Sequence, residues 1–343
     1  MHRPILLVAR SLAVLALFAA ATATPLGSSG GSPSRARAAT TVPVGTSFPR
    51  PTMNSPITIP LHVGSDSLHL DDSRDYILVM PPQKKTGPLY IRGGHDVEVI
   101  GGYMSTTTKG PNINISDDSG TQSGRIVHIE GVLIDGSSGV PSDGIKIQAP
   151  NTIVQLENDR IVGLWGTLGG YHADVVQPGG GVKELRIDGL TGASHYNDLY
   201  FRRETNPLEP PTGKVTIRNA NTFGYVNPKG TAPATTIRGI AIGTQSNPPS
   251  DDSQAINCTL TDPLVFDNFW VTPPAGVRPG QFVWPDDNME GGASWCDSAF
   301  AAGSSTVSWP GLSSAKGGKV SGAINVGAHP DFVPAGSVGL GYR

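Results

Sequence analysis

Hydrophobic and polar residues alternate in six short segments of this chain that share one pattern: apolar, any, apolar, any, then glycine or asparagine. The segments span residues 97–101, 127–131, 154–158, 185–189, 215–219 and 264–268. Alternation is typical of a β-strand with one buried face, because successive side chains point to opposite sides. Glycine and asparagine enter the left-handed backbone region at least cost, so each segment is expected to end in the same sharp bend.

The spacing of these segments predicts the architecture. Their first residues are 30, 27, 31, 30 and 49 positions apart. Short strands repeated at such intervals bury their apolar side only when neighbouring repeats stack. We therefore expect an all-β, single-stranded parallel β-helix, a solenoid, in which Val127, Val154 and Leu185 share one interior column. The alternative is a β-sandwich of hairpins, which the long repeat and the missing hairpin dipeptides disfavour.

A second set of strand-like segments lies between the first and implies at least two strands in each coil. These segments are residues 89–91, 145–147, 175–176, 199–201 and 237–242. The composition agrees with a turn-dense β protein, because 343 residues include 44 glycines and 30 prolines and only 15% are charged. No long amphipathic helical stretch occurs in the sequence.

The N-terminal part of the chain predicts export. Residues 1–23 combine an early basic residue, an apolar run and a small-x-small site, the layout of a secretory signal peptide. Residues 24–54 are rich in Ser, Gly and Pro and predict a flexible leader. The domain is expected over 55–343, with a loop-rich part at 276–343. We therefore predict a secreted, extracellular monomer without a membrane span after export.

Two further features of composition limit the chemistry. Cys258 and Cys296 are the two cysteines, and in an oxidising compartment they predict one disulfide, worth roughly 4 kcal/mol for this loop length. Two unpaired buried thiols are the alternative. A formal net charge of −3 provides no field that would attract DNA or RNA, so no nucleic-acid partner is expected.

Candidate chemistry gathers between residues 142 and 204. Aligning Asp143, Asp174 and Asp198 on successive coils places Lys146, Gln177 and Phe201 in register three residues later. Carboxylates stacked at the strand spacing of about 4.8 Å would repel by roughly 3 kcal/mol, so the stack needs a cation such as calcium, an arginine or a proton to compensate it. Alternatively, each aspartate accepts backbone N–H groups within its own turn.

Histidine and aromatic side chains bracket the same region. His172 and His195 each precede an aspartate of this set. A histidine beside a carboxylate can act as a general acid or base, and a turn residue is the alternative for both. Aromatic faces beside polar groups are typical of a sugar-binding groove, and packing under a loop is the alternative. The aromatic residues are Trp165, Tyr171, Tyr196 and Tyr200.

The coil pattern, the second strand set and the export signal together resemble the pectin lyase-like superfamily over about residues 55 to 275. The resemblance implies a right-handed parallel β-helix. The segment 142–145 is similar to the N-T-D-G stretch of polygalacturonases, although Thr is missing and no second Asp-Asp or Gly-His-Gly motif follows. The segment 172–177 resembles an H-x-D-x-x-Q stretch of secreted bacterial β-helix proteins, and residues 331–336 have a similar character.

The resemblance implies a secreted protein that acts on an acidic polysaccharide, with β-elimination from a uronate as the favoured chemistry. Lys146 or Arg202 would be the base, with His172 and Asp174 also in the catalytic set. Calcium would bind the three aspartates, Asp143, Asp174 and Asp198. The sugar would contact Gln177, Trp165, Tyr171, His195 and Tyr200.

Two alternatives to the lyase stay open. One is a non-catalytic carbohydrate-binding or cell-surface structural protein that uses the same face. The other is glycoside hydrolysis, in which two carboxylates flank the scissile bond. Asp143 and Asp198, two coils apart, would span the wider of the two separations known for such pairs.

Overall fold

The computed structural model describes residues 48–166, 170–202, 212–224, 240–245, 264–273, 306–307 and 320–342. Among these residues the regular structure is β-strand apart from one short 3-10 helix, η1 (Gly136–Ser138). The predicted signal peptide, Cys258 and Cys296 lie outside the described residues. The described part holds no helix with the length and apolar character needed to cross a membrane.

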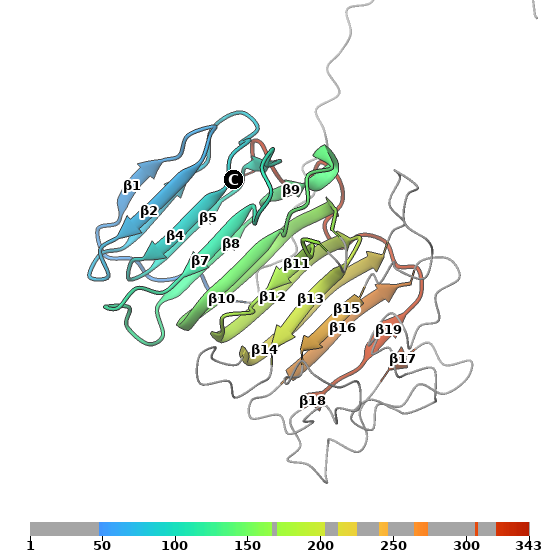
Figure 1. Ribbon diagram of the computed structural model, residues 1–343. Helices are drawn as coiled ribbons and strands as arrows, with labels where there is room; N and C mark the ends of the chain where they lie inside the picture. Colours follow the sequence, from blue (N-terminus) through green and yellow to red (C-terminus); the bar gives the residue numbers. More distant parts are fainter. Residues whose placement is uncertain are drawn as a thin grey trace, which may run out of the picture. The chain divides into compact units, whose positions relative to one another are not determined.

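The strands, labelled in Figure 1, form two mainly parallel ladders that we name sheet A and sheet B. Sheet A contains β1 (Ile57–Pro60), β3 (Tyr76–Val79), β5 (Val97–Ile100), β6 (Tyr103–Met104), β8 (Ile126–Glu130), β9 (Leu133–Asp135), β12 (Val182–Ser194), β14 (Thr212–Gly224), β16 (Leu264–Thr272), β17 (Thr306–Val307), β18 (Val320–Ser321) and β19 (Ile324–Val326). Sheet B contains β2 (Asp66–Leu70), β4 (Leu89–Gly93), β7 (Ile113–Ser116), β11 (Asp174–Gln177), β13 (Asn197–Arg202) and β15 (Ile240–Gln245). The long strand β10 (Ile145–Leu164) belongs to both sheets. Among the described strands, β17 with β19 is the one antiparallel pair.

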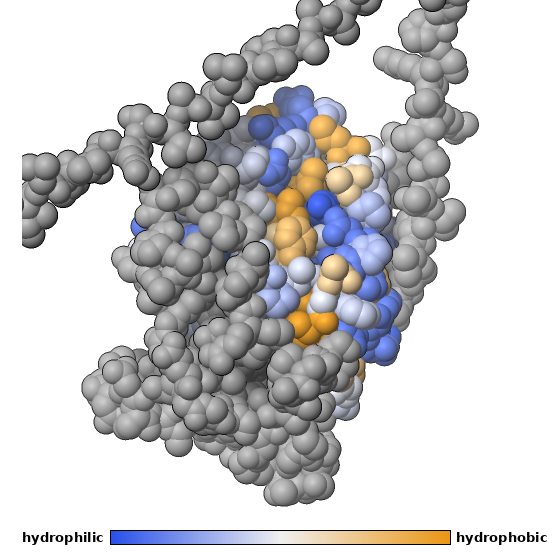
Figure 2. Space-filling view, turned by 90° about the vertical axis from the view of Figure 1, so that its right-hand side faces the viewer, coloured by the Kyte–Doolittle hydropathy of each residue, from blue (hydrophilic) through white to orange (hydrophobic). Residues whose placement is uncertain are grey.

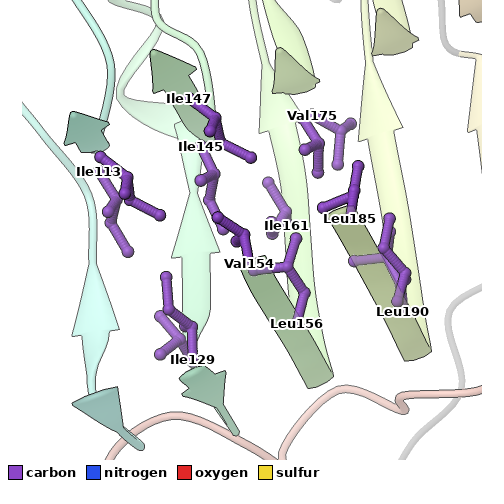
Figure 3. Close-up of a cluster of buried hydrophobic side chains, with 14 of the residues drawn as sticks. Ile113, Ile129, Ile145, Ile147, Val154, Leu156, Ile161, Val175, Leu185 and Leu190 are labelled. Carbon is purple, nitrogen blue, oxygen red and sulfur yellow. The ribbon is translucent and has the colours of Figure 1, made fainter. Parts of the chain in front are cut away.

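The predicted interior column is confirmed by the strand register. Val127 pairs with Val154, and Val154 pairs with Leu185. The column continues to Val97 on one side and to Val215 and Leu264 on the other. These side chains are buried, and Figure 3 shows Val154 and Leu185 within the core. Stacked coils give a parallel ladder of this kind, whereas a sandwich of hairpins gives antiparallel pairs.

The bends after the strands take the predicted backbone conformation. Asn158, Asn219 and Asn268 have φ values of 53°, 45° and 57°. Gly131 and Gly189, which occupy the same place in other coils, have φ values of 72° and 73°. Because all five residues lie in the left-handed region, each coil turns at the same point and the strands beyond the bend stay in register.

Sheet B supplies the second wall of the core. Its buried column contains Leu89, Ile113, Ile145, Val176 and Leu199, in successive register. All five side chains have no exposed surface. Ile113 and Ile145 point toward the residues of sheet A in Figure 3. The outward residues between these positions are consequently set side by side on neighbouring coils.

Both ends of the described chain fold back onto the coils. The N-terminal segment, residues 48–50, lies on the outer face of sheet A, where Arg50 Nε donates to Glu130 Oε2 at 2.8 Å. The C-terminal tail, residues 328–342, follows the bends back toward β5, beside which the end of the chain lies in Figure 1. There the Tyr342 hydroxyl donates to Glu130 Oε1 at 2.7 Å.

The tail is anchored along its length. Arg160 Nη1 donates to Asp331 Oδ2 at 2.6 Å, and the Val333 amide donates to Thr191 Oγ1 at 3.0 Å. Gly339 exchanges backbone hydrogen bonds with the bends of two coils.

On the face shown in Figure 2, hydrophobic residues form a band beside hydrophilic ones. Val79 and Leu340 are nevertheless the large hydrophobic residues that the described part leaves exposed.

Candidate functional site

A column of five partly exposed residues crosses the outer face of sheet B, and we name it the sheet B column. Its members are Tyr90, Asn114, Lys146, Gln177 and Tyr200. The strand register pairs Tyr90 with Asn114, Asn114 with Lys146, and Lys146 with Gln177. The pairing of Val176 with Leu199 continues the column to Tyr200. Four strand spacings separate its ends, a length of about 19 Å.

The chemistry of the sheet B column is that of a surface for sugars. Phenol rings stand at both ends, and an apolar ring face can pack against a pyranose ring. The amides of Asn114 and Gln177 can exchange hydrogen bonds with hydroxyl groups. The Asn114 Oδ1 atom is itself buried and has no hydrogen-bond partner among the described residues, so the amide nitrogen is the group that Asn114 offers to a ligand. Lys146, at the centre, brings a positive charge that would attract a carboxylate.

Asp143 lies just before β10 and is buried beside this column. Its Oδ2 atom accepts a hydrogen bond from the Tyr171 hydroxyl at 2.6 Å, and its Oδ1 atom accepts from the Asp174 amide at 3.1 Å. Burial raises the pKa of Asp143 to about 6, against the two hydrogen bonds and the charges of Lys146 and His172, which lower it. Asp143 therefore exchanges its proton within the range in which many enzymes work.

A half-exposed aromatic group adjoins Asp143. Burial, followed by the negative charge of Asp143, raises the pKa of the Tyr171 phenol, which keeps its proton. Lys109 Nζ lies 5.4 Å from the centre of the Tyr171 ring. The exposed His172 ring stacks on Tyr196 with 4.4 Å between ring centres. The structure thus brings Tyr171 and His172 together with Asp143, near Lys146.

The predicted alignment is confirmed for Lys146 with Gln177 and is wrong for Asp198. Asp174 pairs with Asn197, so Asp198 is one residue out of register and Phe201 is not level with Gln177. Asp198 therefore alternates with the buried Leu199 and does not join Asp143 and Asp174 in one column. Asp198 is fully buried, where its Oδ1 atom accepts from the Ser194 amide at 3.0 Å. Burial raises its pKa well above the ordinary value.

Three other predicted site residues have described contacts with backbone groups. His195 is buried, and its Nδ1 atom lies 2.7 Å from the Gly166 carbonyl oxygen. Trp165 is half-buried, and its carbonyl accepts from the Ser142 amide at 3.1 Å. Arg202 ends β13, where its backbone pairs with Gln245. None of these backbone contacts assigns the residue to a reaction.

Two groups of three described residues place possible metal-ligand atoms within 4.8 Å of one another. They are Asp75, His95 and Asp96, and His128, Glu130 and Glu157. Asp143, Asp174 and Asp198 do not form such a group in the described part of the chain. The second group was not predicted, because Glu157 joins His128 and Glu130 only through the register between two coils. The available signal was His128-x-Glu130, a spacing that puts both side chains on one face of a strand.

No protein-family model matches this chain, and comparison with curated proteins and with solved structures gave no match either. Function is therefore inferred from the residues of the site.

Proposed function

We propose that this protein is exported, folds as a right-handed parallel β-helix of the pectin lyase-like type, and binds an acidic polysaccharide across the outer face of sheet B. The observation that carries this proposal is the sheet B column, in which two tyrosines flank two amides and a lysine on neighbouring strands. A linear glycan laid across the coils would meet a ring, an amide and a cation in turn.

The charges near this column favour an acidic ligand. Lys146 lies at its centre, and Lys109 stands over the Tyr171 ring at its side. Uronate carboxylates would gain from both ammonium groups, whereas a neutral glycan would use the rings and amides alone.

Calorimetric titration with oligosaccharides of galacturonate and of alginate, and with a neutral glucan as comparison, tests the binding proposal. Lys146→Met should weaken binding of the uronate oligosaccharides at least tenfold, because it removes the central charge. Lys183→Met is the matched control, since Lys183 is an exposed lysine of sheet A. Absent binding of every uronate, or equal losses in both variants, would contradict the proposal.

β-Elimination on the same face is the second candidate function, and the hydrogen-bonded pair of Asp143 and Tyr171 favours it. A lyase must neutralise the uronate carboxylate and remove the neighbouring proton. Lys146 would serve the first need or act as the base itself. Asp143, with its pKa raised to about 6 and its hydrogen bond to Tyr171, is the group of this site best suited to take up a proton at neutral pH.

Absorbance of the unsaturated product separates the lyase from a binding protein. Pectate and alginate would be incubated with the protein in calcium and in a chelator, which also tests the predicted calcium requirement. Asp143→Asn should abolish product formation while it leaves binding within about threefold of the unsubstituted chain. Product formation that survives Asp143→Asn would remove Asp143 from the mechanism. Binding without any product would leave the chain a carbohydrate-binding protein.

A further inference from the structure

A second polar group lies on the outer face of sheet A and has no role in glycan binding. His128 and Glu130 come from β8 and Glu157 from β10, and one ligand atom from each lies within 4.8 Å of the other two. Glu130 and Glu157 are direct neighbours in the strand register. The exposed fractions of His128, Glu130 and Glu157 are 0%, 3% and 0%. An imidazole and two carboxyl groups are thus gathered away from water.

Glu157 lacks the partners that a buried carboxylate needs. Neither of its carboxylate oxygens has a hydrogen-bond partner in the described part of the chain, although the Phe48 amide lies nearby. Glu130, by contrast, accepts from Arg50 through Oε2 and from Tyr342 through Oε1. Burying an unpaired carboxylate is costly, so Glu157 requires a proton or a cation.

Negative groups outnumber positive ones around Glu157. Glu98 is level with His128 on the adjoining strand, so three glutamates share this face with the guanidinium of Arg50. One divalent cation would balance the charge that Arg50 leaves uncompensated.

We propose that His128, Glu130 and Glu157 form a binding site for a divalent transition-metal ion, of which zinc is the representative. Imidazole nitrogen and carboxylate oxygen are ordinary zinc ligands, whereas calcium takes oxygen ligands alone. Three protein ligands leave one position of a tetrahedral ion for water.

The N-terminal segment occupies the cation position in the described state. Arg50 Nη2 lies 2.7 Å from Glu130 Oε2. Gln155 Nε2 donates to the Pro49 carbonyl at 3.0 Å and faces His128 Nδ1 at 3.2 Å. This arrangement assigns the ring proton to Nε2, which donates to Glu130 Oε2 at 3.1 Å.

Zinc and the N-terminal segment should therefore exclude each other. An ion bound at His128 Nε2 takes the place of that proton, which moves to Nδ1 of the same ring. The Gln155 side-chain amide must then rotate so that its oxygen faces Nδ1, and this rotation breaks the hydrogen bond to the Pro49 carbonyl. Glu130 must also exchange Arg50 for the ion. Removing Arg50 should consequently strengthen metal binding rather than weaken it.

Titration of the metal-stripped full chain with zinc chloride tests the site. One zinc ion should bind per chain, Glu157→Gln should weaken binding at least tenfold, and Arg50→Ala should strengthen it about tenfold. His95→Gln is the matched control, because its group of Asp75, His95 and Asp96 is more exposed and its carboxylates already accept backbone amides. It should leave the affinity unchanged.

Two further measurements distinguish the loss of a metal ligand from a loss of folding. Circular dichroism should show that Glu157→Gln keeps the β spectrum, since the side chains have the same shape. Cobalt bound in place of zinc should give visible absorption bands that disappear in His128→Gln. Absent zinc binding, equal affinity in Glu157→Gln, or weaker binding in Arg50→Ala would each overturn the proposal.

Discussion

The outer faces of sheets A and B carry polar residues at equivalent positions but are covered differently. On sheet B, Lys146 and its neighbours in the column stay partly exposed. On sheet A, Glu130 and Glu157 occupy the same kind of outward position, yet the N-terminal segment and Tyr342 bury them. An outward position in a coil therefore does not by itself identify a solvated residue. The covering segment decides whether the face can receive a ligand.

The largest expected effect comes from the bend beneath Tyr342. Gly131→Asn should cost about 3 kcal/mol of unfolding free energy, because a Cβ atom at Gly131 would lie 2.1 Å from the Tyr342 ring. Gly189→Asn is the matched control, because its Cβ would meet mainly the end of the Asn158 side chain, at 2.7 Å. It should cost less than about 1 kcal/mol. Urea unfolding measures both.

A double variant separates the ring from the backbone in that experiment. If the Tyr342 ring causes the loss, Gly131→Asn should cost little when it is added to Tyr342→Ala. An unchanged cost in the Tyr342→Ala background would mean that the bend itself rejects asparagine. That outcome would weaken the view that the tail seals sheet A.

The buried acid of the sheet B site should make stability depend on pH. The pKa of Asp143 is about 6 in the folded protein and 3.8 as an ordinary value, so the folded state binds this proton more tightly. Its contribution to stability should be present below pH 4 and should be lost as the pH rises toward 6, by at most about 3 kcal/mol. Asp143→Asn should remove that part of the slope in urea unfolding between pH 4 and 6. Parallel slopes in the two proteins would contradict the assigned shift.

Loss of the ion pair on sheet A should destabilise the metal-free protein. Arg50→Ala should lower the unfolding free energy by about 1 to 2 kcal/mol, since the buried Glu130 then loses a charged partner. Thermal unfolding in a chelator measures the change. Arg92→Ala, at an exposed ion pair with Asp118, is the control and should change stability by less than about 1 kcal/mol. Equal effects would mean that burial of Glu130 is unimportant.

The smallest expected effect compares an aromatic residue on each face. Tyr90→Ala should weaken uronate binding five- to tenfold, about 1 kcal/mol, through loss of one ring face. Phe48→Ala should leave binding unchanged, because the Phe48 ring lies between Arg186 and Arg218 on sheet A. Titration of both variants with one oligosaccharide gives the comparison. A loss of binding in Phe48→Ala would reassign the ligand face.

The stacked architecture could be predicted from the sequence, because alternation and left-handed bends are local properties of each segment. The alternation within each segment predicts that Val127, Val154 and Leu185 are buried, and they share one column. The residue type of Asn158 predicts its left-handed bend. Strand β7 was not expected, although residues 113–116 do alternate. The sequence around β7 resembles that of a polar loop. In the structure the strand is held between β4 and β10, where Ile113 pairs with Leu89 and Ile145.

The site could be predicted only in part, because register between coils depends on the length of each connection. The connection between β12 and β13 is shorter than that between β10 and β11, and Asp174 pairs with Asn197, so Asp198 lies one residue away from the predicted alignment. The sheet A group depends on contacts with residues far away in sequence, such as Arg50 and Tyr342. No local pattern reports those contacts.

The contact between Tyr342 and Glu130 joins residues 212 positions apart. During synthesis, coils can wind as they emerge from the ribosome, but the carboxyl group of Glu130 gains its Tyr342 partner only after the coils that lie between them in the sequence have been made. This one phenol thus makes the second predicted repeat, and its neighbour at Asn158, depend on a segment that is synthesised much later.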